Sequence, residues 1–256
     1  MAAVTFLGTG PGDVTAGRFQ SSVLLECAGA NVLCDAGEPC SGRLLDLGCA
    51  LGDIDAVWIT HAHSDHTGGL PLFLQACASH GRTRPLSLGL PRHLHKPFEA
   101  WMAAVLFPME RLGFSLEIFD WEAGRTVKLG DLKVTPHLTT HLPGRPAGSP
   151  DLVPESFLFD VNYAGGRVVY SGDLGAAGDL ASVLDAPMDL LICELAHLSL
   201  ESLLGVLKPA AIGTLCLTHL PEALDGRRGE IKETCDEGLP GVDSVFLPAD
   251  GERIAF

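Results

Sequence analysis

The side chains best suited to chemistry in this chain lie within six consecutive positions, at His61, His63, Asp65 and His66. A short β-branched and aromatic run over residues 57–60 precedes them, and two glycines and an apolar segment follow, which predicts a turn between a strand and a helix. Side chains two positions apart point to the same side of extended backbone, so His61 and His63 can reach one point. Asp65 and His66 come after the bend and can reach a second. This spacing predicts two neighbouring metal ions.

The ligand types limit which ions fit. Neutral imidazole suits Zn, Fe and Ni, carboxylate suits harder ions such as Mn, and no cysteine lies within the cluster. We therefore expect two divalent metal ions, with Zn as the first choice and Mn or Fe as alternatives.

Residues 60–71 read T-H-A-H-S-D-H-T-G-G-L-P, and this segment resembles the signature H-x-H-x-D-H of the metallo-β-lactamase fold superfamily. The segment F-L-G-T-G at residues 6–10 resembles the N-terminal loop of the ribonuclease Z-like and phosphodiesterase branch. The resemblance implies an α/β fold, a four-layer αβ/βα sandwich with two mixed sheets inside and helices outside. The metal ligands would come from loops along one edge of both sheets.

The resemblance implies three more ligands. The segment L-T-T-H-L-P at residues 138–143 is similar to the third metal motif and assigns His141, although His137 at the end of a predicted strand competes with it. The strand and turn ending in Ser171-Gly172-Asp173 are similar to the fourth motif, whose aspartate bridges both metals, and L-T-H at residues 217–219 to the fifth, which assigns His219. The implied first site is His61, His63 and His141; the implied second site is Asp65, His66 and His219; Asp173 bridges the two.

Three further residues receive supporting roles. In ribonuclease Z-like proteins a glutamate and a histidine assist proton transfer to the leaving group, and Glu194 with His197 are the implied counterparts. The competing interpretation is a capping cluster, because Ser199 can cap a helix over residues 200–207. Asp65 would also orient the attacking water, and the family implies that Asp35 supports the site without binding metal.

The chain of 256 residues is 46% hydrophobic and can bury a large core, so we expect a single domain over residues 1–256. Predicted strands alternate with predicted helices, among them helices over 41–47, 70–79, 97–107 and 229–236. The first residues lack a basic and apolar leader, and no apolar run is long enough to span a membrane. The eight cysteines form no C-x-x-C pair and most lie in apolar runs, so we expect reduced, buried thiols and a cytoplasmic protein with no membrane partner.

The formal charge is −15, from 32 acidic and 17 basic residues. Proteins that bind large nucleic acids usually present a basic face, so this charge disfavours a large RNA. Arg92, His93, His95 and Lys96 form the most cationic stretch, either a substrate clamp or a solvated loop. The sequence also leaves no room for the long substrate-binding arm that transfer-RNA-processing members carry. These features favour a small-molecule or short nucleic-acid phosphodiester.

We therefore expect a two-metal hydrolase, most simply a phosphodiesterase acting on a cyclic nucleotide or short oligonucleotide, in which a metal-bridging hydroxide is the nucleophile. An ester, lactone or thioester hydrolase on the same site is the first alternative. A mononuclear iron oxidoreductase and a non-catalytic binding module are weaker ones. Members of this branch are often homodimers, so the resemblance also implies a homodimer.

Overall fold

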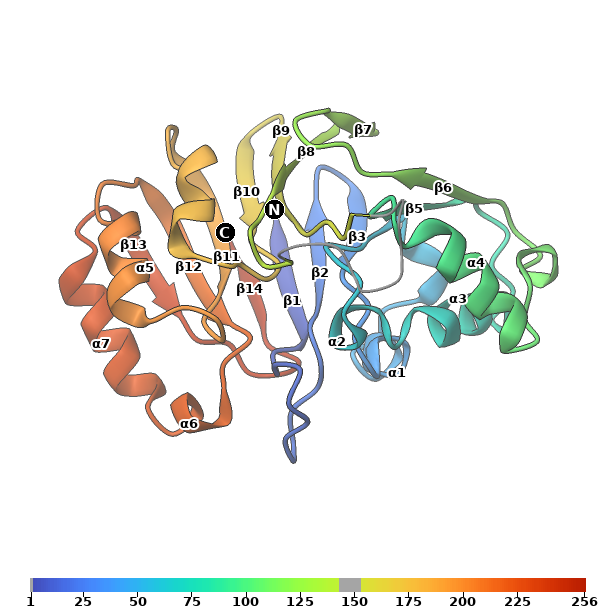
Figure 1. Ribbon diagram of the computed structural model, residues 1–256, viewed down its shortest axis with the longest axis horizontal. Helices are drawn as coiled ribbons and strands as arrows, with labels where there is room; N and C mark the ends of the chain where they lie inside the picture. The colour runs from blue at the N-terminus through green and yellow to red at the C-terminus, as the bar shows by residue number, and fades with distance from the viewer. Residues whose placement is uncertain (1, 143–152) are drawn as a thin grey trace.

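Two mixed β-sheets form the centre of the molecule in a computed structural model that describes residues 2–142 and 153–256 (Figure 1). In this part of the chain the first sheet has the strand order β14-β1-β2-β3-β4-β5-β6 and the second has the order β13-β12-β11-β10-β9-β8-β7. The strands of the first sheet are β1 (Ala3–Gly8), β2 (Ser22–Cys27), β3 (Ala30–Cys34), β4 (Ala56–Trp58), β5 (Leu86–Leu90), β6 (Leu116–Asp120) and β14 (Arg253–Ala255). Those of the second are β7 (Val127–Leu129), β8 (Leu132–Leu138), β9 (Phe157–Tyr163), β10 (Gly166–Tyr170), β11 (Met188–Glu194), β12 (Ile212–Thr218) and β13 (Val242–Phe246).

Both sheets repeat one pattern of pairing. In the first, β14, β1, β2 and β3 pair antiparallel, and β3, β4, β5 and β6 pair parallel. In the second, β7 to β10 pair antiparallel and β10 to β13 pair parallel. Parallel neighbours need crossover connections, which is where the helices lie. The two halves are therefore built alike.

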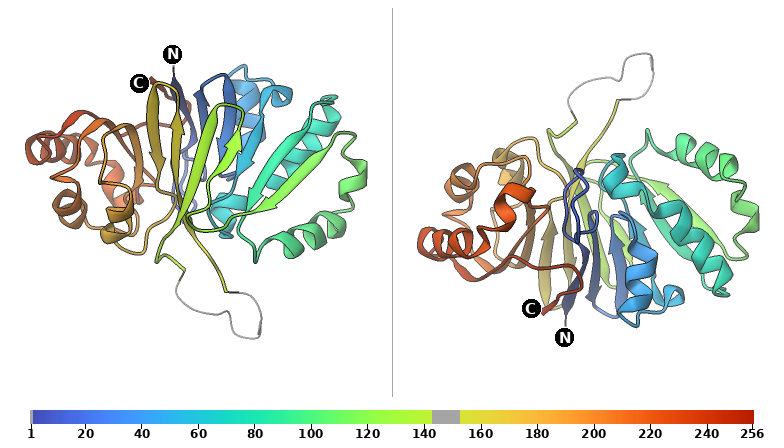
Figure 2. Two further views of the ribbon diagram at one scale, coloured as in Figure 1. Left: turned by 90° about the horizontal axis from the view of Figure 1, so that it is seen from above. Right: turned by 90° about the horizontal axis from the view of Figure 1, so that it is seen from below.

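Helices cover the outer face of each sheet, so the layers run helix, sheet, sheet, helix (Figure 2). The first half contributes α1 (Cys40–Asp46), α2 (Ser64–Thr67), α3 (Leu70–Ser79) and α4 (His95–Ala104). The second contributes α5 (Leu200–Leu207), α6 (Glu222–Asp225) and α7 (Arg228–Gly238). Short 3-10 turns lie at Leu51–Asp53, Met109–Arg111 and Ala177–Ser182.

Each strand supplies two layers of core because successive side chains alternate between the faces of a sheet. In β2, Val23 and Leu25 belong to the core between the sheets, whereas Leu24 packs under the helices of the first half. The central core also contains Trp58 and Phe159, which meet edge to face with ring centroids 6.0 Å apart. A third apolar cluster lies under α5 and α7. The sandwich is thus held by three apolar layers.

The predicted αβ/βα sandwich with two mixed sheets inside is confirmed. The helix predicted over 70–79 has these bounds, and the helix predicted over 97–107 begins earlier, at His95, and ends at Ala104. Strand β14 pairs antiparallel with β1. Among the described residues, no helix is both long and apolar enough to cross a membrane.

Candidate metal centre

The predicted ligands follow the carboxyl ends of strands from both sheets. His61 and His63 come after β4, and the short helix α2 carries Asp65 and His66. From the second sheet, His141 follows β8, Asp173 follows β10 and His219 follows β12. Because these strand ends meet at one edge of the sandwich, segments far apart in sequence bring their side chains to a single place.

The first group consists of His61, His63, His141 and Asp173, with one potential ligand atom from each residue lying within 4.8 Å of the others. Nε2 of His141 is 3.1 Å from Nδ1 of His63 and 3.4 Å from Oδ2 of Asp173. Nε2 of His61 is 3.7 Å from the same carboxylate oxygen. This is the set that the sequence assigned to the first metal, together with the bridging residue.

The second group consists of Asp65, His66, His219 and Asp173, again with ligand atoms within 4.8 Å of one another. Nε2 of His66 is 3.2 Å and Nε2 of His219 is 3.4 Å from Oδ1 of Asp173. Asp65 Oδ2 lies 3.4 Å from His66 Nε2 and 3.7 Å from His219 Nε2. Asp173 therefore turns one carboxylate oxygen toward each group.

The donor atoms themselves show that this set fits metal ions. His61 Nε2, His66 Nε2 and Asp173 Oδ1 are buried, and none has a hydrogen-bond partner within the described part of the chain. Leaving a buried polar atom unpaired costs about 1–3 kcal/mol, so such atoms need an explanation. Imidazole nitrogens and carboxylate oxygens converging from several sides are the ligands that divalent zinc and its neighbours take. Bound divalent metal ions would satisfy these atoms.

The protonation states of the two ligand groups favour metal binding. Burial lowers the pKa of His61, His63 and His141, so these imidazoles stay neutral. Burial alone would raise the pKa of Asp173, but His66 and His219 outweigh it and hold that pKa well below its usual range. The shared carboxyl is therefore an anion, as a bridging ligand must be.

Asp35 organises the site from behind. Its buried carboxylate accepts hydrogen bonds from the backbone N–H of Thr60 at 2.8 Å and from the Tyr170 hydroxyl at 2.8 Å, and it lies 2.7 Å from Nδ1 of His66. A carboxylate on the far nitrogen of a metal-binding histidine fixes its ring and tautomer. The geometry agrees with the supporting role expected for Asp35, whose backbone φ of 58° is the left-handed conformation that Asp tolerates better than most residues. Tyr170 is a member of this network that the sequence did not reveal.

Ser21 contacts the Nδ1 atom of His219, as Asp35 contacts the Nδ1 atom of His66. Its hydroxyl is 3.0 Å from Nδ1 of His219, and both residues are buried. His219 itself has φ of 55°, and the Arg18 guanidinium donates to the carbonyl of the next residue, Leu220, at 2.6 Å. Sequence reasoning missed Ser21 and Arg18 because nothing in the local sequence links them to a histidine about 200 positions away.

Glu194 and His197 meet beside the metal ligands. Nδ1 of His197 is 3.1 Å from Oε1 of Glu194 and 3.8 Å from Oδ2 of Asp173. The hydrogen bond to Glu194 raises the pKa of His197. The capping interpretation also describes part of the geometry: Glu194 accepts from the backbone N–H of Ala196 and His197, and Ser199 caps α5 by accepting from Ser202. Glu194 thus fixes the loop that carries His197.

A cavity of about 330 Å³ opens over the two ligand groups. Its walls are formed by metal ligands, by Ala196 and His197, by Pro221, and by Pro11, Gly12 and Asp13 of the loop after β1. His137 lies within β8, opposite Leu158, and belongs to neither ligand group. Residues 92–96 do not line this cavity: His95 is 2.8 Å from Asp120, and His93 accepts from the backbone N–H of Glu155. The sequence between His141 and the strand at Phe157 also predicts a long loop over residues 143–154 that borders the pocket, and this loop lies, up to residue 152, outside the described residues.

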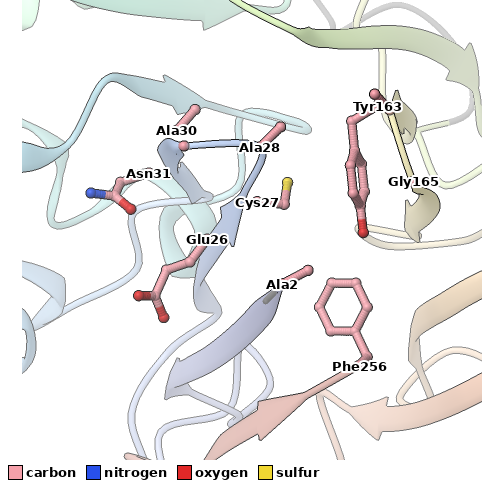
Figure 3. A pocket seen from close by; sticks show the side chains of 11 residues that line it. Ala2, Glu26, Cys27, Ala28, Ala30, Asn31, Tyr163, Gly165 and Phe256 are labelled. Carbon is pink, nitrogen blue, oxygen red and sulfur yellow. The ribbon is translucent and has the colours of Figure 1, made fainter.

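A larger cavity of about 600 Å³ lies between the β2–β3 turn, the β9–β10 turn and the ends of the chain (Figure 3). Tyr163 and Phe256 stand on one side of it, with Cys27 facing them. These turns are at the ends of β2 and β10 opposite to the ends near Ser21 and Asp173, so this cavity is remote from the candidate metal centre.

Sequence comparison relates this chain to proteins named ribonuclease Z. Ribonuclease Z of Pyrobaculum calidifontis is 31% identical over 210 residues, which cover 75% of this chain and 72% of that protein. Ribonuclease Z of Pyrobaculum neutrophilum is 28% identical over an alignment that covers 98% of this chain and 97% of the relative. The match to the Clostridium novyi ribonuclease Z is 34% identical but spans only 40% of that enzyme's length.

Solved structures share the whole fold at low identity. YhfI, a metallo-β-lactamase fold protein of Bacillus subtilis, superposes with a TM-score of 0.77 at 19% identity and covers 99% of this chain and 98% of its own. The short form of human tRNase Z gives 0.75 at 21% identity, with the same coverage of both chains.

The fold, the paired ligand groups and these relatives define a ribonuclease Z-like protein of the metallo-β-lactamase fold superfamily. Within that class, a family model described as Anti-Pycsar protein Apyc1 matches residues 2–232. The chain belongs to this family.

Proposed function

We propose that this protein is a metal-dependent phosphodiesterase whose two divalent ions, most simply Zn, are held by the two ligand groups of the candidate metal centre. The observation that carries the proposal is Asp173, which turns Oδ1 toward His66 and His219 and Oδ2 toward His61 and His141. Relatives named ribonuclease Z and a structural neighbour titled a diphosphatase support phosphate chemistry at such a site. The eight free cysteines fit the reducing cytoplasm as its location.

Two bound ions would supply an activated water and would neutralise charge that develops on the phosphoryl oxygens. The protein must then position the diester and protonate the leaving group. Hydrolysis forms one bond from the water oxygen to phosphorus and breaks the bond from phosphorus to an ester oxygen, which departs as an alcohol once it takes up a proton.

His197 is suited to give that proton. It lines the cavity over the ligand groups, and because Nδ1 bonds to Glu194, Nε2 is the ring nitrogen that would protonate the leaving group. Because the same bond raises the pKa of His197, the protonated ring persists to higher pH than that of an unpaired histidine. Glu194 contacts the ring at Nδ1 and accepts from the backbone N–H groups of Ala196 and His197, so it is a positioning residue rather than a donor.

The substrate that fits best is small. The cavity of about 330 Å³ lies at the lower end of the range for small-molecule sites, and the net charge of −15 opposes a long polyanion. We propose a cyclic nucleotide or a short oligonucleotide. For a 3′,5′-cyclic nucleotide, breakage at the 3′ oxygen would yield a 5′-monophosphate.

The test is hydrolysis of bis(p-nitrophenyl) phosphate, p-nitrophenyl acetate and a lactone by protein whose metal content is measured by plasma mass spectrometry. Turnover of the diester with about two ions per chain supports the proposal and leads to a panel of purine and pyrimidine cyclic nucleotides and dinucleotides. Turnover of the acetate or lactone alone would instead establish a carboxylic ester hydrolase. A single iron without hydrolysis would point to redox chemistry, and metal-loaded protein inert toward every substrate would indicate a binding module.

A further inference from the structure

The loop between β1 and β2 forms one wall of the cavity over the metal ligands. Pro11, Gly12 and Asp13 all line this cavity, and a Cβ added at Gly12 would lie 3.3 Å from the Asp65 carboxylate. The loop therefore packs directly against a metal ligand. Asp13, the next residue, also lines the cavity and is exposed.

The base of this loop is firmly held. Asp250 accepts from the backbone N–H and hydroxyl of Thr9 at 2.8 and 2.7 Å and from the N–H of Phe19 at 2.7 Å. The Arg18 guanidinium contacts the carbonyls of Thr9 and Leu220, which joins the loop to the segment of His219. Both stems of the loop that carries Asp13 are therefore tied to the body of the protein.

Acidic side chains outnumber lysine and arginine side chains around the opening. Among the described residues that line the cavity, the ionisable ones are three aspartates and three histidines, and none is lysine or arginine: Asp13, Asp65, Asp173, His63, His197 and His219. Asp65 and Asp173 belong to the metal-ligand groups, whereas Asp13 belongs to neither. Asp13 thus adds a negative charge at the rim that no metal ligation uses.

We propose that Asp13 is a specificity-determining residue that disfavours substrates carrying negative charge beyond the single phosphodiester at the metal centre. A second phosphate on the substrate would approach this carboxylate without a lysine or arginine among the described lining residues to offset it. Two like charges about 7 Å apart in water repel by an amount equivalent to about a threefold change in binding, and a less polar surrounding increases it. The inference rests on the proposed phosphodiesterase function and narrows its substrate class to singly charged diesters.

The test compares wild-type protein with Asp13→Asn and Asp13→Lys, and uses Asp131→Asn as the matched control. Asp131 is exposed at the turn between β7 and β8, at the end of β8 opposite to the segment of His141, so this control removes the same charge from outside the cavity. The substrates are bis(p-nitrophenyl) phosphate, with one charge, and a 5′-phosphorylated thymidine trinucleotide, with several. A second readout is the binding of a fluorescent phosphorothioate decanucleotide, followed by fluorescence anisotropy.

We expect kcat/KM for the trinucleotide, divided by that for the simple diester, to rise about threefold in Asp13→Asn and about tenfold in Asp13→Lys. Decanucleotide affinity should rise in parallel, the gain should shrink as salt is increased, and Asp131→Asn should match wild type. Equal changes for both substrates, or unchanged decanucleotide affinity in both variants, would overturn the role of Asp13. Absence of any diester turnover by metal-loaded wild type would instead overturn the proposed function. The role of Asp13 would then be tested by decanucleotide binding alone.

Discussion

Asp173 connects the two ligand groups through opposite oxygens of one carboxylate, so its removal should affect both metals at once. Asp173→Ala leaves the histidines in place but takes away the shared anion that lies among them. We expect metal content to fall from two ions toward one or none and diester hydrolysis to be abolished, while the far-ultraviolet circular dichroism stays that of a folded protein. Metal analysis and the rate with bis(p-nitrophenyl) phosphate check this prediction, with Asp131→Ala as the control for loss of a carboxylate. A variant with two ions and an undiminished rate would show that Asp173 is not the bridge.

His197 should matter in proportion to how poor the leaving group is. An alkoxide needs a proton and general acid catalysis typically contributes about 10²–10⁴-fold, whereas p-nitrophenolate departs without one. We therefore expect His197→Ala to lose about 10²-fold or more with a dinucleotide and less than about tenfold with bis(p-nitrophenyl) phosphate.

His93→Ala is the comparison for the loss of a half-buried histidine outside the cavity, and it should leave both rates near those of the wild type. Losses of equal size on both substrates in His197→Ala would assign His197 to binding or to structure instead of proton transfer.

The sequence was most informative where the chemistry is local. His61, His63, Asp65 and His66 are adjacent in the chain, so their types and spacing alone indicated two metals, and the structure brings them together as expected. The more distant ligands needed the family resemblance, since a lone L-T-H or S-G-D is an ordinary turn. Ser21, Tyr170 and Asp13 could not be found in this way because they reach the site only through strand pairing and loop packing between remote segments.

At the scale of the elements, β5 shows how tightly the strands pack around the site. A Cβ on Gly89 would lie 2.3 Å from Cζ2 of Trp121, whose indole N–H donates to the carbonyl of Ile59 just before the metal motif. Gly205 in α5 is the opposite case, because a Cβ there would meet nothing within 4 Å. The two glycines therefore permit a matched pair of substitutions.

Gly89→Ala should lower the free energy of unfolding by about 1–3 kcal/mol, since it overpacks a buried site. Gly205→Ala should raise it by about 0.5–1 kcal/mol, since alanine favours a helix more than glycine does. Thermal unfolding of both variants with metal content held constant provides the comparison. A stabilised Gly89→Ala would show that Trp121 moves aside freely.

Amphipathic helices were easier to predict from the sequence than the pairing of strands. Helix α3 was located from the spacing of Leu70, Phe73 and Leu74, all of which are buried. By contrast, β14 is only three residues long and has no apolar run, so its place beside β1 depends on the folded first sheet rather than on its own sequence. Short edge strands of this kind are recruited by the sheet that they join.

For the molecule as a whole, the apolar layers should protect the cysteine thiols from chemical modification. All eight cysteines are free, and all except the half-buried Cys49 are buried. Burial raises the pKa of Cys27, Cys40 and Cys216 to about 12, so at pH 8 almost none of these thiols is the reactive thiolate. We expect a thiol reagent such as dithiobis(nitrobenzoic acid) to modify at most Cys49 in the native protein and all eight thiols in guanidinium with a chelator. Rapid reaction of several thiols in the native state would contradict the packing described.

The candidate metal ligands are divided between the two sheets, so metal binding depends on how the two halves are aligned. Four ligands follow β4 and three follow strands of the second sheet, and the layer between them contains Trp58 and Phe159. A substitution that lets one sheet slide against the other would separate the two sets of ligands without touching any of them. The two halves can shift relative to each other while each half keeps its own helices packed. Variants in this central layer should therefore be assayed for metal content before a loss of activity is ascribed to unfolding.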